Sequence, residues 1–188
     1  MEVHPFTPFL PDGARLLMLG TFPPAPKRWC MEFYYPNFTN DMWRIFGYCF
    51  FDDKMHFVCQ ERKTYDLDAI VDFLKEKGIA LFDTCTRIER TKNTASDKDL
   101  LVLEQTDLPA MVRSLPQCEA VVTAGQLATT LCCRQFNANE PKVGDFTDID
   151  FEGRHIRLYR MPSSSRAYPM AVEKKASFYQ RVFNYLQI

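Results

Sequence analysis

The stretch that organises the chain runs from Leu16 to Gly47 and reads LLMLGTFPPAPKRWCMEFYYPNFTNDMWRIFG. Its first four residues are apolar and Gly20 ends the run, which is typical of a strand buried on both faces in a parallel sheet. Ligands of open α/β sheets bind in the crevice outside the carboxyl ends of such strands. The loop that begins at Gly20 is therefore the first place to expect a functional site.

Outside this stretch, short apolar runs alternate with helical patterns. Further strands are expected at 79–82, 120–122 and 155–159, and helices at 41–46, 67–77, 106–115, 126–136 and 172–186. A turn at Glu152 and Gly153 joins the last strand to 149–151 in a short hairpin. The alternation predicts an α/β fold, a three-layer α/β/α arrangement around a central, mainly parallel four-stranded sheet. At 188 residues we expect a single domain, 1–188.

Charge and cysteine content narrow the function classes. The net charge of -1 excludes a uniformly basic protein, so any contact with nucleic acid depends on a local patch. The seven cysteines include no C-x-x-C pair that would suggest a zinc or iron–sulfur site, and we expect reduced thiols in a cytoplasmic protein. No apolar run is long enough to span a membrane, and the first residues lack the pattern of a secretion signal. We expect a monomer.

Three loops follow strand ends and are expected to meet at one edge of the sheet: 20–40, 83–96 and 161–168. The second begins a polar segment, 83–99, that lacks any period and is long for a connection, which favours a functional loop. The loops offer aromatic rings that can stack on a base, and hydroxyl and basic groups that can hold phosphate. Together they suit a nucleotide unit.

Four motifs in this order carry a family resemblance: GTFPP at 20–24, FYYPNFTNDMW at 33–43, GIALFD at 78–83 and MPSSS at 161–165. They resemble the signatures of the uracil-DNA glycosylase superfamily, nearest the hypoxanthine-DNA glycosylase branch and then the mismatch-specific branch. The resemblance implies that damaged DNA is the partner and that a deaminated base (hypoxanthine, xanthine or uracil) is flipped into a pocket. Its N-glycosidic bond is then hydrolysed, with no metal and no organic cofactor.

The resemblance also implies a role for each site residue. Asn40 matches the asparagine that serves catalysis in the hypoxanthine branch. Asp83 falls where the first branch has a base-reading asparagine, and a carboxylate there favours a purine-like lesion over uracil because it accepts from a ring N–H. The residues expected to bind the base are Thr21, Phe22, Tyr34, Tyr35 and Asp83. Those expected to bind the DNA backbone are Ser163, Ser164, Ser165 and Arg166.

Two departures from the family pattern keep other functions open. Phe22 stands where other branches carry the Asp or Asn that activates water, and Met161 replaces a His or Asn that donates to the base. A catalytically weak or inactive nucleic-acid-binding member of the same fold is therefore one alternative. A hydrolase of free nucleosides is another.

Several polar residues also have plain structural interpretations. Asn40 is equally what a helix needs at its N-terminal cap, and the two roles can coexist. Lys174 and Lys175 are expected to form a solvated face. The three histidines are too far apart in sequence to suggest a ligand set, and each is expected to be structural or exposed: His4, His56 and His155.

Overall fold

The computed structural model describes residues 1–188. Its α-helices are α1 (Met42–Phe51), α2 (Leu67–Lys77), α3 (Leu108–Arg113), α4 (Gln126–Gln135) and α5 (Val172–Leu186), and its 3-10 helices are η1 (Pro26–Arg28) and η2 (Asp97–Asp99). Its strands are β1 (Glu2–Val3), β2 (Leu16–Gly20), β3 (Val58–Cys59), β4 (Thr64–Tyr65), β5 (Ile79–Asp83), β6 (Cys85–Arg90), β7 (Leu100–Gln105), β8 (Ala120–Ala124), β9 (Phe146–Phe151) and β10 (Arg154–Met161).

The central sheet has five strands in the order β5-β2-β8-β10-β9. Neighbours among the first four are parallel, and β9 pairs antiparallel with β10 at one edge. Every residue of β2 and β5 is buried, as their unbroken apolar runs predict. The mainly parallel three-layer fold is thus confirmed. The strand number differs from the expected four because the first arm of the predicted hairpin joins the sheet as β9.

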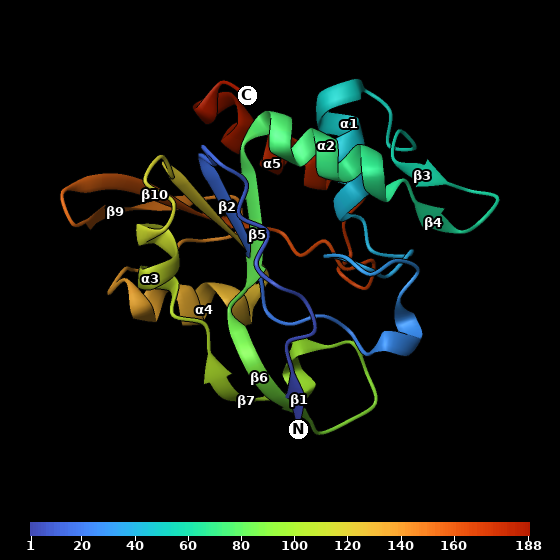
Figure 1. Ribbon diagram of the computed structural model, residues 1–188, viewed down its shortest axis with the longest axis horizontal. Coiled ribbons are helices and arrows are strands. Elements are labelled where there is room, and N and C mark those ends of the chain that lie inside the picture. The colour runs from blue at the N-terminus through green and yellow to red at the C-terminus, as the bar shows by residue number, and fades with distance from the viewer.

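Helices cover both faces of this sheet. Figure 1 shows α1, α2 and α5 gathered on one side and α3 and α4 on the other. Local signals define α2 best: the Asp66 side chain accepts from the Ala69 N–H, and Gly78 ends the helix in the left-handed conformation. Aromatic rings on α1 and α5 pack together, with the ring centres of Phe46 and Phe183 5.4 Å apart. One continuous core therefore joins helices and sheet.

The segment 83–99 is not the irregular loop that its sequence predicts. Strand β6 occupies 85–90 and pairs antiparallel with both β1 and β7 in a separate three-stranded sheet. Its residues alternate only roughly between buried and exposed, and the pairing with β7 shifts register twice near Arg87. These irregularities interrupt the period of two by which a strand is recognised in sequence. Only the residues between β6 and η2 form an open loop.

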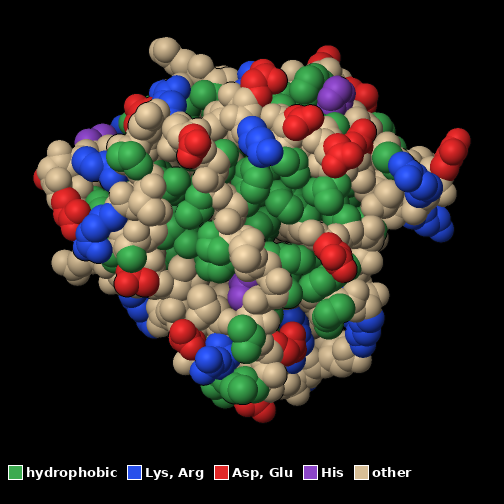
Figure 2. All heavy atoms as spheres, viewed as in Figure 1, with side chains coloured by type: hydrophobic (Ala, Val, Ile, Leu, Met, Phe, Trp, Pro, Cys, Tyr) green, Lys and Arg blue, Asp and Glu red, His purple; other side chains and the backbone are tan.

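The state of the cysteines and the distribution of surface charge agree with what the composition predicts. All seven cysteines are free, and burial raises the pKa of the Cys85 and Cys118 thiols to about 11. No helix combines the length and the apolar character needed to cross a membrane. Figure 2 shows basic and acidic side chains interspersed around the margin of one face, with apolar side chains across its middle. No single sign of charge covers that face.

Candidate active site

A cavity of about 150 Å³ opens at the carboxyl ends of the parallel strands. Gly20 at the end of β2, Asp83 at the end of β5 and Ala124 at the end of β8 lie in its wall. The three loops expected to meet do meet here. All ten residues to which the sequence assigned a role line this cavity: Thr21, Phe22, Tyr34, Tyr35, Asn40, Asp83, Ser163, Ser164, Ser165 and Arg166.

A glycine and a carboxylate lie side by side in the wall of the cavity. Gly20 and Asp83 are direct partners in the β2–β5 register, and a Cβ on Gly20 would lie 2.5 Å from Asp83 Oδ1. Glycine is therefore needed for the carboxylate to lie over this position. The Nε2 of His4 is 2.9 Å from Asp83 Oδ2, and the His4 side chain is only 4% exposed. His4 thus holds one oxygen of Asp83 and leaves the other beside Gly20.

A second carboxylate lies in the same wall. Thr21 Oγ1 donates to Asp97 Oδ2 at 2.7 Å, and Asp97 lines the cavity. Burial raises the pKa of Asp97 above its ordinary value, and the negative charge of nearby Asp83 raises it further, against the Thr21 hydrogen bond, which lowers it. The wall is consequently rich in hydrogen-bond acceptors. Asp97 was not among the predicted site residues, although it lies in the segment 83–99 that the sequence marked as functional.

Asn40 lies one residue before Asp41, the N-cap of α1. Its Oδ1 accepts from the Met42 N–H at 2.9 Å, so its side chain satisfies a free N–H at the helix start. Asp41, which occupies the N-cap position itself, makes no side-chain cap bond. The Asn40 amide nitrogen donates no hydrogen bond within the protein, while the residue lines the cavity. Capping and exposure to the cavity therefore coexist in one side chain.

The two adjacent tyrosines differ in how their hydroxyls are used. Tyr34 is 3% exposed, and its hydroxyl donates to the Thr7 carbonyl at 2.7 Å. Tyr35 has a left-handed backbone with φ of 51°, which is uncommon for a residue with a side chain, and its buried hydroxyl has no partner. Burial raises the pKa of both tyrosines, so both stay neutral. Phe22 is half-buried, with its ring edge-on to His4 at 5.2 Å.

The third loop supplies hydroxyl groups and one exposed cation. Ser164 is buried, and its carbonyl accepts from the Asp41 N–H at 2.9 Å. The exposed Arg166 donates through Nη2 to Asp41 Oδ1 at 3.2 Å. Met161, which precedes this loop, is 1% exposed and belongs to the apolar core. Its position therefore supplies no polar group to the cavity.

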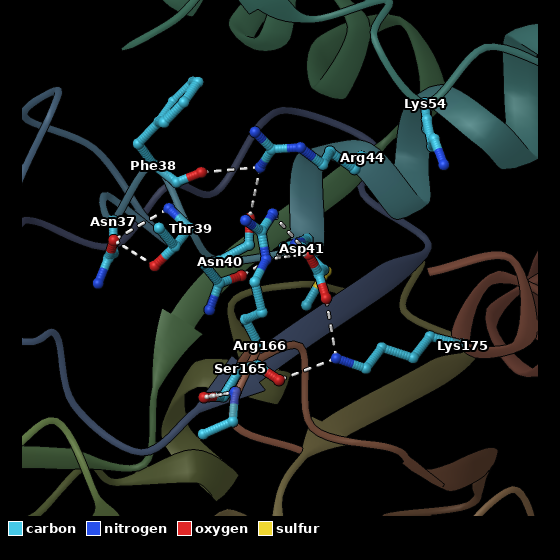
Figure 3. A network of polar contacts seen from close by, with 12 residues as sticks. Asn37, Phe38, Thr39, Asn40, Asp41, Arg44, Lys54, Ser165, Arg166 and Lys175 are labelled. Carbon is cyan, nitrogen blue, oxygen red and sulfur yellow. Dashed lines mark hydrogen bonds and ion pairs between the residues drawn. The ribbon is translucent and has the colours of Figure 1, made fainter. Parts of the chain in front are cut away.

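Lys175 corrects one prediction from sequence. Lys174 is exposed as expected, but the Lys175 side chain is fully buried. Its ammonium donates to Asp41 Oδ2 at 3.0 Å and to the Ser165 carbonyl at 2.8 Å (Figure 3). A lysine can enter a core when its charge is paired and its donors are satisfied, and the partner here is 134 positions away in sequence. Helical periodicity alone cannot reveal such a partner.

Comparison with known proteins places the fold. No protein-family model matches the sequence, and no curated protein sequence matches it either. A solution NMR structure of a proposed uracil DNA glycosylase from Methanosarcina acetivorans matches with a TM-score of 0.65 and 20% sequence identity. The match covers 97% of each chain. The chain described here therefore has, over nearly its whole length, the fold of that Methanosarcina acetivorans protein.

Proposed function

We propose that this protein is a monofunctional DNA glycosylase that hydrolyses the N-glycosidic bond of a deaminated base flipped out of damaged DNA. The observation that carries the proposal is the single cavity at the strand ends, where Asn40, Asp83 and the serine-rich third loop converge. The fold shared with a proposed uracil DNA glycosylase supports it. So do the four sequence motifs, since each of them contributes at least one residue that lines this cavity.

Asn40 is assigned the catalytic role. As the glycosidic bond stretches, the sugar becomes cationic and a water must approach it, so a fixed polar group beside the sugar lowers the barrier. The bond from the Met42 N–H fixes the orientation of the Asn40 amide. Its Oδ1 keeps a second lone pair that can accept from the water or face the developing cation. The helix cap thus pre-organises the catalytic group.

Asp83 is assigned to base recognition. An ionised carboxylate only accepts hydrogen bonds, so its Oδ1 selects a base that presents a ring N–H or an exocyclic amine. Asp97 adds a second acceptor to the same wall. Uracil and hypoxanthine both carry one ring N–H on the paired edge, but uracil flanks it with two carbonyl oxygens that two carboxylates repel. This wall therefore favours hypoxanthine, a purine-like lesion, over uracil.

The third loop and the aromatics complete the arrangement. The hydroxyls of Ser163 and Ser165 and the guanidinium of Arg166 stand at the rim, where the phosphates flanking a flipped nucleotide would lie. Phe22, Tyr34 and Tyr35 wall the cavity with rings, and Thr21 holds Asp97. These residues bind and orient the nucleotide, while Asn40 acts on the bond.

The direct test uses short duplexes that contain hypoxanthine, xanthine or uracil, followed by alkaline cleavage at abasic sites. We expect strand breaks with hypoxanthine in excess of those with uracil. Asp83→Asn keeps the size of the side chain but adds an N–H donor, and it should shift the preference toward uracil. An unchanged order of substrates in Asp83→Asn would remove the base-reading role of Asp83.

One alternative has its own structural support. Phe22 carries no group that could activate water, and Met161 is buried away from the cavity, so two aids to hydrolysis are missing. A protein that binds damaged DNA without cleaving the bond fits these two positions. In the same assay it would retain the duplex and give no breaks. Base release from free nucleosides alone would instead indicate a nucleoside hydrolase.

A further inference from the structure

Asp41 is a carboxylate shared by two cations from different parts of the chain. Its Oδ2 accepts from the Lys175 ammonium at 3.0 Å, and its Oδ1 accepts from Arg166 Nη2 at 3.2 Å and Nε at 3.4 Å. Figure 3 shows the carboxylate between the two basic side chains, beside Asn40. The Asp41 and Lys175 side chains are 4% and 0% exposed, whereas Arg166 is 52% exposed.

The charges of this cluster do not cancel. One carboxylate faces two cations, so the three side chains carry a net charge of +1. Lys175 makes the shorter contact with Asp41 and cannot reach solvent, so its charge is balanced by the carboxylate. The uncompensated positive charge therefore rests on the exposed guanidinium of Arg166. Asp41 engages only the Nε and Nη2 of that group, and Nη1 has no partner in the protein.

We propose that Asp41 and Lys175 are positioning residues for Arg166. Asp41 fixes the guanidinium at the rim of the cavity, and Lys175 neutralises Asp41, which leaves the Arg166 charge available to a backbone phosphate of DNA. This inference rests on the proposed function, because it takes DNA as the ligand. Lys175, which DNA cannot touch, thus controls phosphate binding through its charge.

The test measures binding of a short duplex with a tetrahydrofuran abasic-site analogue over a series of salt concentrations. Each phosphate contact contributes about 0.9 to the slope of log K against log salt. Arg166→Gln should lower the slope by about 0.9, and Lys175→Met should lower it nearly as much, because Asp41 then neutralises Arg166. Adding Asp41→Asn to Lys175→Met removes the negative charge but keeps an amide oxygen that can still accept from Arg166 and hold it at the rim, so it should restore the slope. Lys174→Gln, an exposed neighbour on α5, is the matched control and should leave it unchanged.

Recovery of the slope in the double variant separates control of phosphate binding through charge from simple structural support. If Lys175 only held the third loop in place, the double variant would bind no better than Lys175→Met, and that result would overturn the proposal. Thermal unfolding identifies variants that fail to fold. Where Lys175→Met does not fold, the double variant alone decides: a wild-type slope supports the proposal, and a slope lowered by about 0.9 refutes it. Base release by the wild-type protein tests the proposed function separately, since this assay needs no bond cleavage.

Discussion

Asn40 has a structural role at the start of α1 and a proposed catalytic role, and substitutions can test the two separately. Asn40→Ala removes the acceptor for the Met42 N–H, and loss of such a cap costs about 1 kcal/mol. For a protein of this size that lowers the midpoint of thermal unfolding by roughly 2–4 °C. The same change removes the proposed catalytic amide, so base release should fall by about a hundredfold or more.

Asn40→Ser separates the two roles. Serine makes the same bond to the N–H two residues on, more weakly than asparagine, so its hydroxyl should restore part of the stability that Asn40→Ala loses. It carries no amide, so base release should stay low. The assays are calorimetry of each variant and single-turnover cleavage of a hypoxanthine duplex. Undiminished strand breaks in Asn40→Ala would refute the catalytic assignment, and an unchanged unfolding midpoint would refute the capping argument.

Three further predictions concern the cavity wall. Burial and the charge of Asp83 raise the folded-state pKa of Asp97, so its ionised form disfavours folding and Asp97→Asn should stabilise the protein at pH 7. This gain should disappear as the pH falls to 3.8, which unfolding midpoints measured across pH would show. Tyr35→Phe removes an unpartnered buried hydroxyl and should stabilise the protein by about 1 kcal/mol, whereas Tyr34→Phe breaks a hydrogen bond and should destabilise it by about as much. Denaturant titrations in which both variants change the free energy of unfolding in the same direction would contradict this. Gly20→Ala forces Asp83 aside and should cost about 1–3 kcal/mol, and adding Asp83→Ala should recover most of it, so strictly additive losses would exclude the clash.

Features with local causes could be predicted from the sequence. The helix from 67 to 77 carries its cap, its apolar face and its terminating glycine within its own residues, and the structure matches. The buried strands β2 and β5 are likewise visible as apolar runs. Strand β6 was missed because irregular register with β7 breaks its alternation, so its polar residues resemble a loop.

The missed polar residues share another cause. His4 binds Asp83 across 79 positions, and Lys175 binds Asp41 across 134. A charged side chain is buried only when the fold brings a partner into contact with it, and no local sequence pattern indicates a partner that is distant in the chain. The sequence therefore located the loops of the cavity, because strand ends are local signals. It did not locate the residues that hold the site residues in place.

The register of the central sheet connects the locally predictable strands with the position of a site residue. Gly20 pairs with Asp83 in the same register that pairs Leu16 with Ile79, and every residue of both strands is buried. A slip of one residue would place Leu19 beside Asp83 and turn each side chain to the opposite face. The carboxylate would then lose the space that the absent Cβ leaves over Gly20. The position of the proposed base-reading group therefore depends on the register of β2 and β5 as well as on the loops around it.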